Sequence, residues 1–553
     1  MSDLHKTVID DKAQPEYSHV EAVADPNSQW ADHDEAIAAE AYQRNLGVWA
    51  SFKMYKKAVF WSFVASSTLI MEGYGTMLLG SFYTLPAFQK KYGDYYPAHD
   101  GGIWSVPANW QMAFTVVTSV GSLVGVLLGA WQVERWGYRW TLIFHLTVLN
   151  AFIAMVTFSP NRIVLIVGQA CCSIPWGVFS TLSTAFASEV LPISLRGFLT
   201  TYVNLSWVIG QLICQGVLNG YAVVHLDETN GYRVPWCIQF MWPVPIIVGI
   251  FFSPESPWWL VRRGRLEEAA ESVRRLASQP DATYIHNNVA MMVRTNNLER
   301  ELAENRGSFA SCFKGTDLRR TEISTMAYGC QVFSGITLGI SGVYFFVQAG
   351  LGTSDAFKLV LGMMAMGFCG TCASWVLISY FGRRSIFLTG MVGMTTALLV
   401  VGILACVSDK HPGALWGIAA MLFVWMAFYQ STVGPLAFTL IGEMSSTRVR
   451  NKTIGLSRGM YNVAALVFGI LNPYMINNTA WGWAGKAGFF YGGIALIATV
   501  WVYFRLPETR GRSYRELDVL FERRVPARKF SSTTVSDDAD EEILRAHEGA
   551  EKQ

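Results

Sequence analysis

Two charged residues, Glu72 and Arg458, lie inside long apolar runs of the sequence and away from the ends of those runs. If the runs cross a membrane, a charge near mid-bilayer costs about 3 kcal/mol on insertion scales, so each should face a cavity or a partner. A carboxyl group that alternates between cavity water and a closed, low-dielectric state changes its proton affinity. Glu72 is therefore a candidate proton carrier, with Arg458 as a competing cation. The alternatives are a protonated, hydrogen-bonded Glu72 and an Arg458 that snorkels to the membrane surface.

A second set of charged residues recurs at matched positions in the two halves of the chain. The interval from Glu189 to Arg196 equals that from Glu443 to Arg450, and a Pro-Glu-Ser sequence after the first half corresponds to a Pro-Glu-Thr sequence after the second. Carboxylates and guanidinium groups at helix ends can pair bidentately. We therefore predict that they pair across the two halves and close a gate; the alternative is that the arginines only fix membrane orientation. The predicted gate consists of Glu134, Arg135, Glu189, Arg196, Glu255, Arg383, Arg384, Glu443, Arg450 and Glu508.

Membrane-spanning helices must position these residues. The chain of 553 residues is 52% hydrophobic and 15% charged, which is typical of a membrane protein. Apolar runs of spanning length lie on both sides of a charged stretch, six before it and six after it. We predict an all-α membrane protein with twelve transmembrane helices in two pseudo-symmetric six-helix bundles, with substrate between them. The predicted units are an N-terminal tail (1–57), the first bundle (58–253), a helical connector (254–322), the second bundle (323–506) and a C-terminal tail (507–553).

The connector and the tails are predicted to lie in the cytosol. Lys and Arg residues near the ends of the runs concentrate on the side of the connector, and the positive-inside rule places that side in the cytosol. Residues 1–57 lack the apolar core of a signal peptide, so the first run should act as the insertion signal. Residues 266–278 and 285–305 are predicted to form amphipathic helices, and the polar sequence after Pro526 to be a disordered tail.

The sequence carries no pattern of an enzyme or of a cofactor site. Most of the nine Cys residues lie inside apolar runs, so no disulfide framework is predicted. Cys369 and Cys372 have the spacing of half a zinc site, but without a second pair we interpret them as packing thiols. Phosphate-binding loops, metal clusters and nucleophile constellations are missing from the sequence, and a net charge of +2 does not point to nucleic acid.

The repeated motifs resemble those of the sugar porter family of the major facilitator superfamily, over roughly residues 58–524. The resemblance is carried by Gly137, Gly382-Arg383-Arg384, the Glu-Arg pairs, Pro254-Glu255-Ser256-Pro257, Gly434-Pro435 and Pro507-Glu508-Thr509. Residues 175–179 and 80–83 resemble the fungal disaccharide branch, with its maltose, lactose and cellobiose permeases. The resemblance implies a monomeric plasma-membrane transporter that moves a neutral disaccharide by alternating access together with a proton. The expected partners are thus a sugar, a proton and the lipid bilayer, without nucleic acid or cofactor.

Amides and aromatic rings inside the runs are the expected sugar contacts. Asn204 and Gln331 match positions at which sugar porters place glutamines, and Gln211 lies two helical turns from Asn204 on the same face. The alternative is that the amides bond neighbouring helices and that the aromatic rings pack or face lipid. The candidates are Asn204, Gln211, Gln331, Gln169, Trp425, Phe438, Tyr461 and Asn462.

The sequence departs from the family at the positions that concern protons. Proton-coupled sugar porters commonly carry Asp after Gly-Tyr in the first helix and Arg in the fourth, where this chain has Gly75 and Gln169. Glu72, one helical turn before Gly75, is then the acid that remains in this region. Three functions therefore stay open: a proton symporter, a facilitative uniporter and a membrane sugar sensor.

Overall fold

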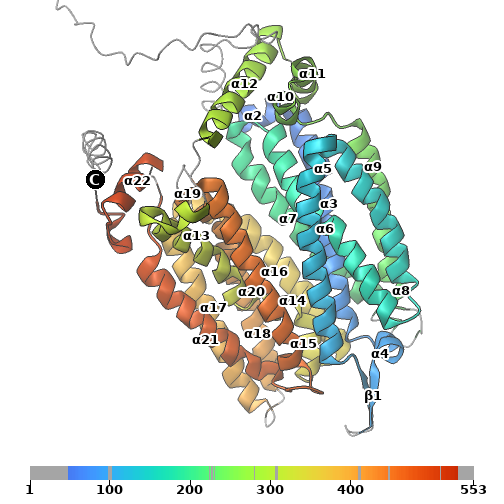
Figure 1. The fold of residues 1–553 in the computed structure, drawn as a ribbon. Coiled ribbons are helices and arrows are strands. Elements are labelled where there is room, and N and C mark those ends of the chain that lie inside the picture. The colour runs from blue at the N-terminus through green and yellow to red at the C-terminus, as the bar shows by residue number, and fades with distance from the viewer. Residues whose placement is uncertain are drawn as a thin grey trace, which may run out of the picture.

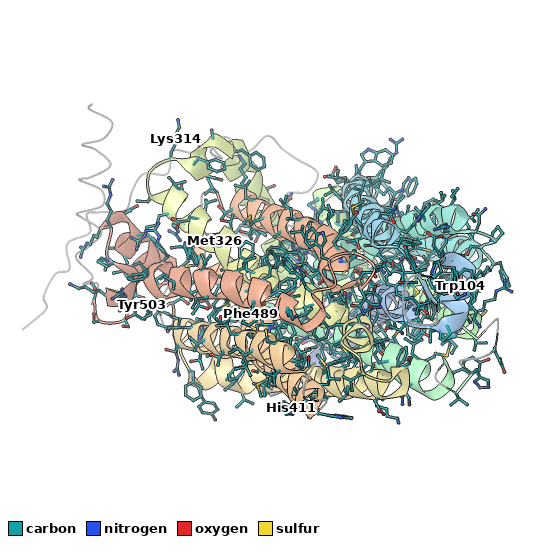
Figure 2. The ribbon with its side chains drawn as sticks, turned by 90° about the horizontal axis from the view of Figure 1, so that it is seen from below. Trp104, Lys314, Met326, His411, Phe489 and Tyr503 are labelled. Atoms are coloured by element: carbon teal, nitrogen blue, oxygen red, sulfur yellow. The ribbon has the colours of Figure 1, made fainter. Side chains whose placement is uncertain are left out.

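The computed structural model describes residues 48–533 apart from 98–101, 223, 226–227, 229–230, 279, 305–308, 409–410, 412, 446–448, 511 and 513. Its described residues are mainly helical, and the helices form two bundles that lie beside each other (Figure 1). Figure 2 shows the same two bundles from one end, with Trp104 on the first and Phe489 on the second. The two bundles follow each other in the chain, as the internal repeat predicts.

The first bundle contains one helix that crosses twice. Helix α5 runs over 50 residues, but Gly137 has a φ of 85° and bends it into two passes. Gly suits this left-handed position because it has no Cβ. The helices of this bundle are α3 (Lys56–Phe82), α5 (Ala108–Thr157), α6 (Arg162–Val190), α7 (Ile193–Val217) with the π segment η2 (Leu218–Ala222), α8 (Arg233–Ile238), η3 (Gln239–Met241) and α9 (Pro243–Phe252).

The second bundle contains two passes that are interrupted. One combines α13, α14 and α15 and bends by 61°, and the other combines α18, the π segment η5 and α19. Helix α13 begins ahead of the start predicted at Ile323. The helices are α13 (Gly315–Phe333), α14 (Ile336–Ile340), α15 (Gly342–Gln348), α16 (Thr353–Tyr380), α17 (Arg383–Val407), α18 (Gly413–Phe428), η5 (Tyr429–Val433), α19 (Gly434–Met444), α20 (Arg450–Ile476), η6 (Ala484–Lys486) and α21 (Ala487–Arg505).

The helical passes agree with the twelve predicted runs. By length and composition, eight helices among the described residues are long and apolar enough to cross a membrane, or nine with the bent α13–α15 pass. Helix α5 contributes two passes to this set. Helices α3 and α7 add the remaining two, although polar residues such as Glu72 and Gln211 make them less apolar.

Short elements mark the two ends of the molecule. One end of the molecule, which we call the connector side, carries four α-helices of the described part of the chain (Figure 1). They are α2 (Val48–Met54), α10 (Pro257–Arg262), α11 (Leu266–Leu276) and α12 (Ala282–Glu304), and the turn η4 (Phe309–Phe313) follows them in the chain. The other end carries α4 (Pro86–Tyr92) and an antiparallel hairpin of β1 (Asp94–Tyr96) and β2 (Ile103–Ser105), with Tyr95 opposite Trp104; we call it the hairpin side. Helices α11 and α12 lie where the two connector helices are predicted, with ends that differ by at most three residues.

The prediction of disorder after Pro526 was wrong as far as Thr533. Helix α22 (Tyr514–Glu522) and the turn η7 (Ala527–Lys529) fold back on the second bundle. Phe530 is fully buried, and its ring centre lies 5.1 Å from that of Phe521. Arg319 of α13 donates a 2.9 Å hydrogen bond to the carbonyl of Val525. Buried Phe530 and the hydrogen bonds to its backbone and its neighbours therefore hold a segment whose average composition is polar.

Candidate functional site

The interrupted pass α13–α15 forms the centre of the candidate site. The chain leaves the helix at Ser334 and Gly335, and Gly335 has a φ of 89°. The indole nitrogen of Trp425 donates a 2.7 Å hydrogen bond to the carbonyl of Ser334, and the amide of Gln331 donates one of 2.7 Å to the carbonyl of Gly434. Broken helices inside a membrane protein occur where the backbone is buried in protein or lines a cavity. Of the two predicted sugar contacts, Trp425 thus donates to the break itself and Gln331 donates to the start of α19.

A cavity of about 250 Å³ lies on one side of this break, between the two bundles. Its walls come from α3, α5, α6, α14, α15 and α20. The predicted residues Gln169 and Tyr461 both line it. Its other polar lining residues include Thr76, Thr115, Thr118, Ser119, Thr337 and Asn472. We call this space the α5–α20 cavity.

A smaller cavity of about 20 Å³ lies on the other side of α14. It is lined by Gln211 and Trp207 of α7 and by Trp425 and Tyr429 of the second bundle. The rings of Trp425 and Tyr429 are stacked with centres 5.3 Å apart. The two rings face each other, and the space beside Gln211 has room for about one water molecule. We call this space the α7–α18 cavity; it brings together the predicted residues Gln211 and Trp425.

Glu72 belongs to α3 of the first bundle and Arg458 to α20 of the second. The Oε2 atom of Glu72 is buried and has no hydrogen-bond partner among the residues that the structure describes. Arg458 lies 5.9 Å from the ring centres of both Tyr328 and Phe438. In the described part of the chain the two groups do not form a direct ion pair. The structure thus leaves the predicted acid and base without a direct contact.

Trp176 fills the space beside Gly75, the position at which proton-coupled sugar porters commonly carry Asp. A Cβ atom on Gly75 would lie 2.6 Å from the ring of Trp176 and 3.3 Å from the amide oxygen of Gln239. These distances leave no room for a side chain unless Trp176 moves. The absence of Asp in the sequence therefore has a steric counterpart in the fold.

On the connector side, Glu255 binds the bend of α5. Its carboxylate accepts hydrogen bonds from the backbone N–H of Tyr138 at 3.0 Å and of Arg139 at 3.2 Å. A Cβ on Gly137 would overlap this carboxylate. Burial raises the pKa of Glu255, although the hydrogen bonds from Ser256, Arg139 and Tyr138 oppose this effect. The bend and the acid therefore depend on each other.

Glu508 repeats this arrangement in the second bundle. Its carboxylate accepts hydrogen bonds from the backbone N–H of Arg383 at 2.7 Å and of Arg384 at 3.2 Å. A Cβ on Gly382 would overlap the carboxylate here as well. The N-terminus of α17 is an anion site because its N–H groups lack partners in the helix. The two sequence repeats therefore have the same three-dimensional contact.

Glu189, at the end of α6, belongs to the network of the first bundle. Its carboxylate accepts hydrogen bonds from the hydroxyls of Tyr138, at 3.0 Å, and Ser256. The guanidinium of Arg262 pairs with it at 2.7 Å. All of these partners belong to the first bundle or to the connector that follows it.

In the state described, the gate residues whose contacts are described do not pair across the two halves; pairing in another state of the carrier stays a prediction. Glu443 accepts a hydrogen bond from the hydroxyl of Thr509 and pairs with Arg383 at 3.3 Å, both within the second bundle. Glu189 and Glu443 thus each bind within their own half, because the Pro-Glu-Ser and Pro-Glu-Thr sequences lie next to them. Glu134 and Arg135 are exposed. Arg196 and Arg450 belong to α7 and α20, but their side chains lie outside the described ones.

The bundles contact each other near the hairpin side. The amide of Gln111 donates a 3.1 Å hydrogen bond to the hydroxyl of Tyr344. The amide of Asn477 donates one of 3.2 Å to the carbonyl of Val106. The α5–α20 cavity lies beside these contacts, since Gln111 and Tyr344 also line it. Toward the connector side, Asn462 and Phe438 are exposed.

Some predicted contacts lie apart from both cavities, and others had been overlooked. Asn204 is half-buried and lines neither cavity, and Asn462 also lies outside them. Overlooked were Tyr344 and the hydroxyl residues of α5. The α5 residues had a recognisable signal, because Gln111, Thr115 and Ser119 recur every four positions and so share one helix face.

Two matched helical bundles with cavities between them define a membrane carrier of the major facilitator type. The inward open xylose transporter XylE from E. coli has this fold, with a TM-score of 0.66 and 19% identity over 84% of this chain and 99% of its own. The chain also matches the family described as Sugar (and other) transporter over residues 61–521. It belongs to that family, which confirms the predicted membership and the expectation of a transporter rather than an enzyme.

The most similar relatives include fungal permeases. The alpha-glucosides permease MPH3 of Saccharomyces cerevisiae is 37% identical over 506 residues, which cover 91% of this chain and 83% of the permease. The maltose permease MAL61 of the same species is 38% identical over 504 residues, which cover 91% and 81%. These relatives agree with the predicted fungal disaccharide branch.

The matched glycines give a stability test. Gly137→Ala and Gly382→Ala should each displace a carboxylate from its N–H partners and destabilise the protein by about 1–3 kcal/mol. Gly137→Ala should cost more because φ at Gly137 is 85°, whereas Gly382 has an ordinary φ of −72°. Melting temperatures of the purified variants measure the effect. Gly459→Ala, where an added Cβ meets no atom within 4 Å, is the control; equal stability of all three variants would contradict the carboxylate contacts.

Restoring the family's acid should fail for a steric reason. Gly75→Asp is expected to lose about 1–3 kcal/mol from overpacking against Trp176, and more from burying the carboxylate. Gly75→Ala separates the two causes, since it adds the Cβ without the charge. Folded yield by size-exclusion chromatography and the melting temperature are the measurements. A Gly75→Ala variant as stable as the wild type would show that Trp176 yields easily.

Proposed function

We propose that this protein carries a neutral disaccharide of the alpha-glucoside type across the plasma membrane by alternating access. The observation that carries the proposal is the α5–α20 cavity between the two bundles, which is lined by the buried amide Gln169 and by several hydroxyl groups. Uncharged hydrogen-bonding groups suit a polyhydroxylated, uncharged ligand. The names of the relatives, which are alpha-glucoside and maltose permeases, support the choice of sugar.

The arrangement of the contacts suggests which way the carrier opens. Hydrogen bonds such as that between Gln111 and Tyr344 hold the bundles together near the hairpin side. The ion pairs of Glu189 and Glu443 remain within their own bundles on the connector side. Positive-inside patterning supports a cytosolic location of the connector side and of both tails. The state described is then one that is closed to the outside.

Glu72 and Arg458 support coupling to a proton. The Oε2 atom of Glu72 has no hydrogen-bond partner among the described residues, so this carboxyl group is available to bind and release a proton as the carrier changes state. Sugar movement that changes the separation of Glu72 and Arg458 would link the two fluxes. The observation that favours a uniporter instead is the loss of the family's acid at Gly75, where Trp176 takes the space. A sensor that uses the same sugar site is the third possibility.

Uptake in a yeast strain without sugar transporters tests the function. We expect accumulation of radiolabelled maltose that excess unlabelled maltose blocks and that a tenfold excess of glucose leaves largely intact. Equal protein at the plasma membrane, checked by a fluorescent tag, is the control. Inhibition by glucose but not by maltose would contradict a disaccharide substrate. Sugar-dependent gene induction without uptake would identify a sensor.

The coupling test removes the proton site but keeps its shape. Glu72→Gln should abolish accumulation above the external concentration, because the side chain can no longer bind and release a proton, while exchange of internal for external maltose continues. Arg458→Ala should reproduce this effect in part. Glu267→Gln on the exposed face of α11 is the matched control. If wild-type cells take up maltose without alkalinising a weakly buffered medium, the protein is a uniporter.

A further inference from the structure

The last membrane pass of each bundle ends in a pair of exposed aromatic residues on the connector side. In the first bundle these are Phe251 and Phe252 at the end of α9, which are 48% and 60% exposed. In the second they are Tyr503 and Phe504 near the end of α21, which are 44% and 55% exposed. The rings of each pair meet edge to face, with centres 5.5 Å and 5.2 Å apart. The two bundles therefore present the same aromatic pair to the lipid around them.

Two arginines adjoin the aromatic pair of the first bundle. Arg139, two residues after the bend of α5, places its guanidinium 4.9 Å from the centre of the Phe251 ring. Its side chain forms no hydrogen bond or ion pair with the residues that the structure describes. Arg275 of α11 donates a hydrogen bond to the carbonyl of Phe252. One guanidinium is thus anchored to the backbone, and the other keeps its terminal N–H groups for a ligand.

The second bundle repeats this set with the two roles exchanged. Arg384, which corresponds to Arg139 in the sequence repeat, donates a 2.9 Å hydrogen bond to the carbonyl of Tyr503. Arg528 of η7 lies 4.5 Å from the centre of the Tyr503 ring and 4.6 Å from that of Phe504. Its guanidinium forms no hydrogen bond or ion pair in the described part of the chain. The folded C-terminal segment thus supplies the second arginine here, as α11 does in the first bundle.

The chemistry of each set fits the headgroup of an anionic phospholipid. A guanidinium held over a ring at the membrane surface lies at the level of the lipid phosphates, and phosphate can accept two parallel hydrogen bonds from it. The exposed rings offer apolar contact to the start of an acyl chain. Two cations beside one headgroup favour a lipid with net negative charge over a lipid whose own cation neutralises the phosphate. The positive-inside rule alone requires cations near the membrane, but not their placement on exposed rings.

We infer that each bundle binds one anionic phospholipid on the connector side, at Arg139 and Arg275 in the first bundle and at Arg384 and Arg528 in the second. The phosphate lies between the two guanidinium groups, and an acyl chain runs along the aromatic pair. The inference does not depend on the sugar or on the proton, because none of these residues lines the α5–α20 cavity or the α7–α18 cavity. A lipid in the second site also ties the C-terminal segment to the membrane.

Native mass spectrometry of the purified protein in detergent counts the bound lipids. With dioleoylphosphatidylserine, the wild type should retain two lipids; with dioleoylphosphatidylcholine at the same concentration, retention should be about fivefold lower. Arg139→Gln and Arg528→Gln should each reduce the count from two to one, and the double variant should fall to the phosphatidylcholine level. Arg274→Gln and Lys529→Gln, which each remove the same charge from an exposed neighbour of a site arginine, are the matched controls and should retain two.

Soluble competitors distinguish a lipid site from a site for a bare anion. A tenfold excess of glycerophosphoserine or of inorganic phosphate should leave most of the phosphatidylserine bound, since neither has an acyl chain to contact the rings. Full displacement by inorganic phosphate would identify an anion site and overturn the inference. Equal retention of the two lipids by the wild type would also overturn it, and this comparison needs no variant to fold. Unchanged retention in the double variant would be a third contradiction.

Discussion

The hydrocarbon interior of a membrane offers no hydrogen-bond partners, and this constraint shapes the site. A spanning helix satisfies its own backbone, so an interrupted one must find partners in the protein. At the break at Ser334 and Gly335, Trp425 donates to the carbonyl of Ser334, while Gln331, which precedes the break, donates to the carbonyl of Gly434 at the start of α19. Trp425 and Gln331, which the sequence suggests as sugar contacts, therefore donate hydrogen bonds to the protein backbone. The short helix that this break creates, α14, separates the two cavities.

The same need for partners explains the connector side. Each bundle ends in a carboxylate, Glu255 or Glu508, that binds the N–H groups at a helix bend or start. Each also has a second carboxylate, Glu189 or Glu443, that binds an arginine of its own repeat. These contacts make each bundle a rigid unit at its connector end. Rigid units are what rocking of one bundle against the other requires.

Glu72 and Arg458 are the two charged residues that lie well inside the apolar runs of the sequence. Arg458 lies beside the rings of Tyr328 and Phe438, and cation–π attraction can stabilise a cation there without neutralising it. Among the described residues it forms no ion pair with Glu72. A fixed pair would remain in one state, whereas an incomplete one can respond to movement between the bundles. Under the proposed proton coupling, the steric closure at Gly75 would leave Glu72 and Arg458 as the charged groups that serve it in this region.

The sequence by itself determined the class of fold and the family, because the lengths of the apolar runs, the positions of charges and the repeated motifs can be read without knowing which helices meet. It also identified Glu72, Arg458, Gln169 and Gln211, since a polar side chain in an apolar run needs a reason wherever it lies. Tertiary structure alone decided partners. It turned Glu443 toward Arg383 of its own bundle rather than across the gate, assigned Gln331 to the backbone of Gly434, and placed Trp176 where an acid was expected. Partners depend on which helix faces meet, and helix rotation and the bend at Ser334 are set by packing between segments far apart in the chain.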